Sequence, residues 1–321
     1  MSSQIASDQT EIKSDSSRQP EDLYGTGLGF LAFLIWGLFP LYFYYLRDVP
    51  PLVTLAFRAV FTSALLIPIV LIRGKFHSIV ETLRHPWLDL GLFVTMATTA
   101  ASWGFFIWLV AVNHTLYASL GNYGSPLVTV AFGALVFRER PRALQLVAIA
   151  LAIIAVVVFA RGIGRLPWES VTIAFVFAIY SVLRKKMDVD STTALSVETL
   201  FATPLGIGYI AYAWSSSVGA EWTTSPRLLA LLVGAGMMTA IPLLLFGSAA
   251  RRCKLSTLGI LNYLTPTGQF LCGVYFLNEA TTIYQWISFV LIWAALVFFT
   301  IDLVLSEKRA QRRLSDDRRS S

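Results

Sequence analysis

Long apolar runs separated by short polar stretches make up most of the chain. Ten of the runs have about 20 residues, the length at which a helix rising 1.5 Å per residue crosses a bilayer core about 30 Å thick. The runs do not alternate between apolar and polar positions as barrel strands do, and lipid leaves open strand edges without hydrogen-bond partners. The pattern therefore predicts an all-α membrane protein with ten transmembrane helices, at residues 26–46, 51–72, 87–112, 115–137, 142–160, 166–183, 194–214, 227–250, 255–277 and 281–305.

Polar segments flank the ten runs. Residues 1–25 are rich in Ser, Gln, Asp and Glu and are expected to be a disordered tail, and residues 306–321 are expected to be a basic tail. Of the 25 Lys and Arg residues, 20 lie on the side of the N-terminus, four on the opposite side and one, Arg58, inside a run. Because short cytoplasmic loops collect positive charge, both termini are expected in the cytoplasm, with the chain in the inner (plasma) membrane.

The composition supports lipid as the surroundings of this chain. Hydrophobic residues make up 56% and charged residues 14%, against about 25% charged residues in a typical soluble domain. The net charge of +6 comes from the loops and the C-terminal tail, where the positive-inside rule accounts for it. We therefore expect the lipid bilayer and a small-molecule substrate as partners, and no nucleic acid. The oligomeric state, monomer or homodimer, stays open.

Motifs that support catalysis are missing from the sequence. Gly74 and Lys75 are followed by Phe76, so the phosphate-binding loop of ATP hydrolysis is not formed. Cys253 and Cys272 have no metal-ligand spacing. An enzyme acting within the membrane would need paired carboxylates or a metal cluster at membrane depth. We expect no enzyme, no cofactor and no metal, so transport would be driven by a gradient or by exchange.

The chain repeats itself at an offset of 140 residues. Each half holds five spans, an odd number, so the second half enters the membrane from the opposite side. The sequence therefore predicts two inverted five-helix repeats, at residues 26–160 and 166–305, an architecture common in secondary transporters. A duplicated scaffold without transport is the alternative. Six identities carry the repeat within 24 positions: Asn122/Asn262, Tyr123/Tyr263, Pro126/Pro266, Gly133/Gly273, Glu139/Glu279 and Gln145/Gln285.

Several short stretches resemble a known family. They include Ile35–Pro40, Trp103, Phe106–Trp108, Ala118–Gly121, Arg184–Lys185, Glu198–Thr199, Pro242–Leu244, Ser256–Gly259 and Ile292–Trp293. In these stretches the chain resembles the paired EamA repeats of the drug/metabolite transporter superfamily, and within it the RarD family. This resemblance implies a ten-helix inner-membrane permease with both termini inside. The chain differs from the family pattern at Phe57, Tyr117 and 122–125, near the expected cavity, so a relative's solute does not transfer to it.

Two charged residues inside spans are candidates for function, because a charge at membrane depth is costly. Arg58 lies about seven residues, roughly 10 Å, into the second span. Its guanidinium could clamp an anionic group, reach the outer interface or form a structural ion pair. Glu198 is its repeat mate, a few residues inside the seventh span. It is a candidate for proton or ion coupling, and otherwise an interfacial carboxylate at a helix start.

The remaining candidates are amides, aromatic rings and prolines within the spans. Pro126 and Pro266 are expected to kink their helices and free carbonyls to line a cavity. Aromatic rings at mid-membrane could stack on a planar solute, and packing or hydrogen bonding between helices is the alternative role. Glu139 and Glu279 are expected to begin the helices that follow them. The hypothesised substrate-binding set is Trp36, Arg58, Trp103, Asn122, Tyr123, Tyr180, Asn262 and Tyr263.

These observations favour a secondary transporter of the RarD type. It would move a small organic solute or drug across the plasma membrane by alternating access between the two halves. The alternatives are an EamA-type exporter of amino acids or metabolites and a non-transporting scaffold subunit. Substrate, direction and coupling ion are not given by the residues.

Overall fold

The computed structural model describes residues 23–72, 79, 81–84, 86–137, 142–187, 189, 191–216, 221–253 and 255–320, and this part of the chain is helical with no strand. Residues 1–22 of the expected N-terminal tail and Glu139 lie outside it. The elements are α2 (Leu23–Gly37), α3 (Phe39–Tyr44), α4 (Pro51–Ile72), α6 (Pro86–Ala111), α7 (Thr115–Phe137), α8 (Ala143–Ile163), α9 (Trp168–Lys186), α10 (Ser191–Ser215), α11 (Glu221–Thr224), α12 (Pro226–Ala250), α13 (Leu255–Leu261), α14 (Leu264–Leu271), the π-helix η1 (Cys272–Phe276) and α15 (Ile283–Ser320).

Each of the ten expected spans coincides with helix. By length and composition, seven helical segments of the described chain can cross a bilayer: Leu23–Tyr44, Pro51–Ile69, Trp87–Ala111, Ala143–Ile163, Thr193–Ser215, Pro226–Ala250 and Ile283–Ser306. The other three expected spans correspond to α7, α9 and the α13–α14–η1 segment. A membrane protein with several spans is therefore confirmed, and the full count of ten stays a prediction.

Prolines explain where two of the helical segments are interrupted. Pro40 has no N–H to donate to the carbonyl four residues earlier, and α2 ends at Gly37, just before α3. In the same way Pro266 follows the interruption between α13 and α14 at Asn262. Pro126, by contrast, lies inside α7, which continues through it as one helix. The kinks expected at Pro126 and Pro266 both stay predictions.

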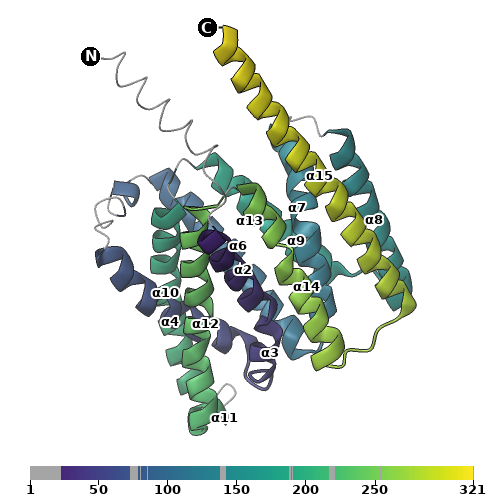
Figure 1. The fold of residues 1–321 in the computed structure, drawn as a ribbon. Helices are drawn as coiled ribbons and strands as arrows, with labels where there is room; N and C mark the ends of the chain where they lie inside the picture. Colours follow the sequence, from purple (N-terminus) through teal and green to yellow (C-terminus); the bar gives the residue numbers. More distant parts are fainter. Residues whose placement is uncertain are drawn as a thin grey trace, which may run out of the picture.

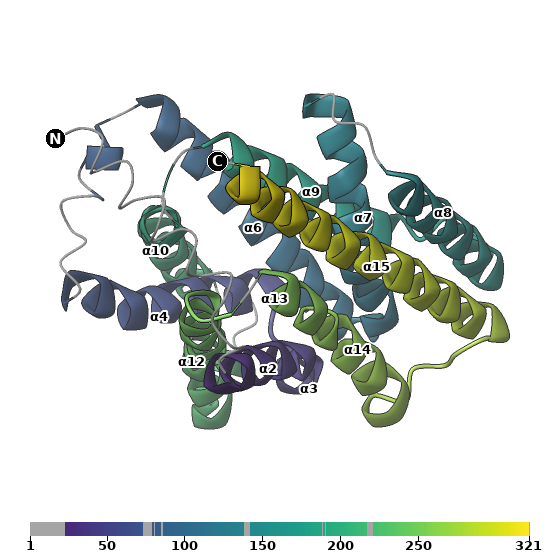
Figure 2. The ribbon, with the colours of Figure 1, turned by 45° about the horizontal axis from the view of Figure 1, so that its top comes forward.

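The helices form two outer groups with a central layer between them (Figure 1). In Figures 1 and 2, α4, α10 and α12 lie on one side and the α8–α15 pair on the other, with α2, α6, α7, α9 and α14 between them. The closest helix pairs are α8 with α15, α7 with α9, α4 with both α10 and α12, and α2 with α12. The C-terminal end of α15 extends beyond the bundle to Ser320.

Glycines allow two of these helices to touch backbone to backbone. A Cβ atom added to Gly268 would lie 2.8 Å from the Cα of Gly37, closer than real Cβ atoms approach other atoms. The contact joins the end of α2 to the middle of α14. Close approach through small residues is the usual way in which membrane helices pack, because lipid provides no hydrophobic force between them.

The core is aromatic and aliphatic, and the outer faces are also apolar. Phe39, Tyr123, Phe159 and Phe289 are fully buried at its centre. Large apolar side chains on the outside, such as those of α8, are well exposed. A soluble monomer rarely exposes such large apolar areas, so the outer faces fit contact with lipid.

Candidate functional site

Arg58 is a buried cation between three helices. Only 8% of the residue is exposed, which excludes a side chain that reaches the outer interface. Its Nε donates a hydrogen bond of 2.8 Å to the hydroxyl of Thr239 on α12. Its Cζ lies 3.9 Å from the ring centroid of Trp103 on α6, a cation–π contact. No carboxylate in the described residues pairs with it.

A second polar group joins α7, α14 and α15. The amide of Asn122 donates to the side-chain oxygen of Gln269 at 2.8 Å. The hydroxyl of Tyr123, a fully buried residue, lies 2.5 Å from that of Thr267. It also accepts a hydrogen bond of 2.8 Å from the indole of Trp293. These bonds cross between the two halves of the chain, and the group contains no ionised side chain.

A small cavity of about 120 Å³ lies beside this polar group. Asn262 and Tyr263, at the interruption between α13 and α14, provide its polar lining together with Thr300. Pro126 closes it from α7. Sites for drug-sized ligands have about 300–1,000 Å³, so a solute of that size requires a rearrangement of the helices. The full lining is Pro126, Gly259, Ile260, Asn262, Tyr263, Phe299, Thr300 and Leu303.

Trp36 lies apart from both groups. Its ring packs against Phe33 at 5.5 Å and against Phe246 of α12 at 5.9 Å. Its indole nitrogen is buried and has no hydrogen-bond partner. A buried donor without an acceptor is unusual, so Trp36 stays a candidate for contact with a solute.

Glu198 and Tyr180 lie together on the other side of α4. Glu198 is 5% exposed, and its Oε1 accepts a hydrogen bond of 2.7 Å from Thr95 of α6. Tyr180 and Arg184 of α9 interact electrostatically with this carboxylate. Glu198 is thus a buried carboxylate with a hydroxyl donor and a nearby cation, which is compatible with the proposed ion or proton coupling.

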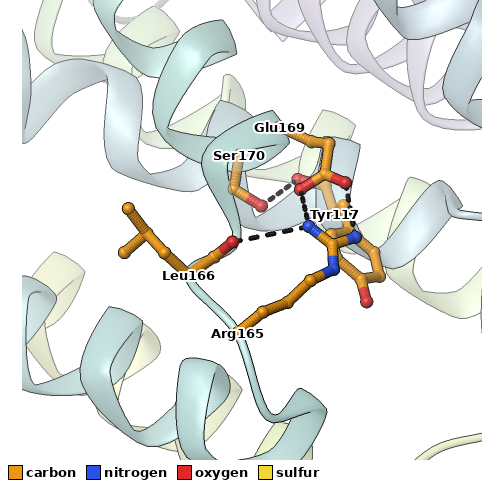
Figure 3. Close-up of polar contacts among 5 residues, drawn as sticks. All are labelled: Tyr117, Arg165, Leu166, Glu169 and Ser170. Carbon is orange, nitrogen blue, oxygen red and sulfur yellow. Dashed lines mark hydrogen bonds and ion pairs between the residues drawn. The ribbon is translucent and has the colours of Figure 1, made fainter.

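One end of the bundle is held by an ion pair next to Tyr117 (Figure 3). The Arg165 guanidinium binds both carboxylate oxygens of Glu169, one of them at 2.8 Å, and this hydrogen bonding raises the pKa of Arg165. Its Cζ lies 5.4 Å from the Tyr117 ring centroid. Ser170 donates a hydrogen bond of 2.7 Å to the carbonyl of Tyr117. The start of α9 is thereby attached to the first turn of α7.

Glu279 has a different role from the one expected. Its carboxylate accepts hydrogen bonds from the backbone N–H groups of Thr115 and Leu116, at 2.6 and 3.0 Å. It therefore caps α7, 163 to 164 positions earlier in the chain, whereas the sequence suggested that it begins the helix after it. Burial raises the pKa of Glu279, and the hydrogen bonds from Thr115 and Leu116 act in the opposite direction.

The candidate residues therefore fall into separate places. Arg58 and Trp103 are in direct contact, Asn122 and Tyr123 belong to the polar group, and Asn262 and Tyr263 line the adjacent cavity. The hydrogen-bond partners Thr95, Thr239, Thr267, Gln269 and Trp293 were missed from the sequence. Gln269 carried a signal, because it is a polar residue inside an apolar run, two helical turns after Asn262.

Comparison with known proteins places the chain in a family. A model described as the EamA-like transporter family matches residues 23–161 and 170–301. The chain belongs to the EamA-like transporter family. Protein RarD of Streptomyces exfoliatus is 37% identical over 304 residues, covering 94% of this chain and 95% of that protein. Protein RarD of Escherichia coli is 33% identical over 288 residues, covering 90% of this chain and 97% of that protein.

Two further comparisons agree with this placement. A protein of Vibrio cholerae named an uncharacterized transporter is 38% identical over 291 residues, covering 90% of this chain and 95% of that protein. A crystal structure with 20% sequence identity superposes with a TM-score of 0.56, covering 86% of this chain and 97% of its own, and shows a shared fold. This EamA-type permease is therefore a RarD-family integral membrane protein and a transporter. The expected resemblance is confirmed.

Proposed function

We propose that this permease is a secondary transporter that moves a small organic solute across the plasma membrane by alternating access. In this proposal all ten spans cross the bilayer, as two inverted five-helix halves at residues 26–160 and 166–305 with cytoplasmic tails. The observation that carries the proposal is the pattern of helix packing. Inverted halves related by a two-fold axis must show contacts that map onto one another when the halves are exchanged.

Many of the helix–helix contacts map onto one another when the two halves are exchanged. Three pairs, α4 with α10, α8 with α15 and α7 with α14, join a helix to its own repeat mate. Three further sets of contacts correspond to one another: α7 with α9 corresponds to α14 with α2, α6 with α9 to α12 with α2, and α12 with α4 to α6 with α10. A duplicated chain that packed its halves as separate bodies would not need this correspondence.

A single hydrogen bond supports the same symmetry at atomic detail. The hydroxyl of Thr203 donates to the hydroxyl of Ser63 at 2.7 Å, and the two residues are 140 positions apart. A residue can contact its own repeat mate only close to the axis that relates the halves. The crossing of α4 and α10 is therefore our candidate for the pivot of the rocking motion.

The halves also differ in a way that alternating access requires. The first and ninth spans are interrupted, as α2 with α3 and as α13 with α14, and these segments pack against each other. Their repeat mates, α9 and α7, are continuous and also pack together. If the halves exchange conformations, α7 and α9 bend and the other pair straightens, which opens the opposite side of the bundle.

Transport is tested with the purified full chain in liposomes. Labelled organic solutes are offered under an imposed proton gradient and under exchange conditions, and empty liposomes are the control. Accumulation above the control in either condition supports secondary transport. If no solute in a broad set of acids, amines and neutral amphiphiles accumulates, transport by this chain is rejected and the scaffold alternative gains support.

Rocking is tested by cross-linking in a background without Cys253 and Cys272. Cysteines at 63 and 203 link the proposed pivot, and cysteines at 115 and 279 link the halves at one end of the bundle. We expect the end link to stop transport and the pivot link to leave at least half of the rate. Equal effects of the two links would contradict a pivot at Ser63 and Thr203.

A further inference from the structure

Among the residues that the structure describes, Arg58 has no counter-charge. Two other arginines of the described chain bind buried carboxylates: Arg142 pairs with Asp302 at 2.8 Å, and Arg165 pairs with Glu169. Both of these arginines are themselves largely exposed, whereas Arg58 is buried. A buried guanidinium without an anion is costly, so the fold retains a position at which an anion would be favoured.

The repeat mate Glu198 cannot supply that anion. Thr199 and Thr203 of α10 lie beside Ser63, whereas Gly206 lies beside Ala56, so α4 and α10 run antiparallel. Arg58 and Glu198 each lie five residues from this crossing in opposite directions. At 1.5 Å per residue they are roughly 12–15 Å apart along the helix axes. The oxygen of Glu198 is moreover bound by Thr95.

The geometry leaves one edge of the guanidinium available. The Nε of Arg58 donates its hydrogen bond to the hydroxyl of Thr239, which in turn donates to the carbonyl of Ala235 at 3.0 Å. One face of the group lies over Trp103. Within the described part of the chain, no hydrogen bond is made by the two terminal nitrogens, which form the edge that binds a carboxylate through two parallel bonds.

The surroundings of this edge favour an organic anion over a small inorganic one. Trp103 packs against Phe39 and Phe106 with ring centroids 5.5 and 5.8 Å apart, so the wall beside the guanidinium is aromatic. Thr54, one helical turn before Arg58 on the same face of α4, is fully buried, and its hydroxyl has no hydrogen-bond partner. The described residues of this site therefore offer hydrogen-bond donors and apolar surface, and none of those named is acidic.

We propose that Arg58 and Trp103 form the anchoring subsite for an amphipathic organic carboxylate, with the carboxylate on the Arg58 edge and the apolar body against the aromatic wall. For transport of that anion the inference rests on the proposed function, whereas binding stands by itself. A lipid phosphate is a less suitable occupant, because Arg58 lies about seven residues, roughly 10 Å, below the start of α4.

Binding is tested on the full chain in nanodiscs of phosphatidylcholine, which contain no anionic lipid. Thermal unfolding is followed with acetate, benzoate, phenylacetate and indole-3-acetate, each paired with its neutral amide, since a ligand of the folded state raises its stability. The variants are Arg58→Gln, Arg58→Lys and Trp103→Phe. Arg227→Gln is the matched control, because Arg227 is an exposed arginine whose Cζ lies 6.0 Å from the Tyr45 ring.

We expect an aromatic carboxylate, and not its amide, to raise the unfolding temperature. The half-saturating concentration should rise at least tenfold in Arg58→Gln, less in Arg58→Lys, and remain unchanged in Arg227→Gln. The inference is overturned if no carboxylate stabilises the protein, if amides act equally, or if Arg58→Gln binds as the parent does. If Arg58→Gln does not fold, Arg58→Lys provides the test, because Lys keeps the charge but cannot bind a carboxylate through two parallel hydrogen bonds. Unchanged binding in Arg58→Lys would then overturn the inference. Binding without flux in liposomes would reject the proposed function and leave this subsite intact.

Discussion

Removing the Glu279 carboxylate should destabilise the start of α7. It accepts two backbone hydrogen bonds, from Thr115 and Leu116 at 2.6 and 3.0 Å, and both donors belong to residues that are at most 1% exposed. A hydrogen bond to a charged group contributes about 1.5–3 kcal/mol, and a buried donor left alone is costly. The cost of burying the carboxylate, visible in its raised pKa, offsets part of this. For Glu279→Ala we expect a net loss of about 2–4 kcal/mol.

The assay is reversible unfolding in mixed micelles with increasing dodecyl sulfate. Glu279→Gln keeps one accepting oxygen and should lose about half as much stability as Glu279→Ala. Asp48→Ala removes a carboxylate that is 74% exposed, so its effect should stay below about 0.5 kcal/mol. Hydrogen exchange of the Thr115 and Leu116 amides should accelerate only in the Glu279 variants.

The reasoning is refuted by either of two results. A loss below about 1 kcal/mol in Glu279→Ala would mean that water or other groups satisfy the two donors. Equal losses in the Ala and Gln variants would mean that the accepting oxygen retained in Glu279→Gln contributes nothing, so the two hydrogen bonds would not be additive.

Three further predictions follow from single contacts. Because burial raises the pKa of Glu279, the unfolded chain loses this proton first as the pH rises. In unfolding titrations the parent should therefore lose stability relative to Glu279→Gln as the pH rises from the ordinary carboxyl pKa, about 4, through the raised pKa of the folded protein. Gly268→Ala places a Cβ 2.8 Å from the Cα of Gly37 and should lower the unfolding free energy by about 1–3 kcal/mol in the same assay. In the control Gly208→Ala the new Cβ meets nothing within 4 Å, so no loss is expected. Equal effects of the two substitutions would contradict the close helix contact. Arg165→Gln leaves the carboxylate of Glu169, which is 3% exposed, without its cation. The variant should lose about 1–2 kcal/mol of unfolding free energy in the same assay, a range that allows for the exposure of the arginine. The control Arg47→Gln removes an exposed pair with Asp48 and should lie within about 0.5 kcal/mol of the parent.

Much of the candidate site could be named from the sequence, but not its connections. Arg58 and Glu198 were recognisable as charges inside apolar runs, and Asn122 and Asn262 as repeated amides. Their pairing was not recognisable, although Trp103 was itself a candidate and Gln269 is a polar residue inside an apolar run. Asn122 binds Gln269, Arg58 lies on Trp103, and Glu198 is held by Thr95. Most of these partners are threonines or aromatic residues, types so common in membrane helices that none carries a signal by itself.

The sequence by itself determined the helices of this permease. In lipid every backbone group must be bonded within its own segment, so each apolar run becomes a helix regardless of its neighbours, and Pro40 and Pro266 interrupt helices for reasons contained within one turn. Only the tertiary structure decided that Glu279 caps α7 and that Arg58 binds Thr239 and Trp103, with no carboxylate of the described residues paired to it. These relations depend on which faces of segments more than 100 residues apart come to lie together. Packing of small and aromatic side chains sets that choice, and no local pattern along the chain encodes it.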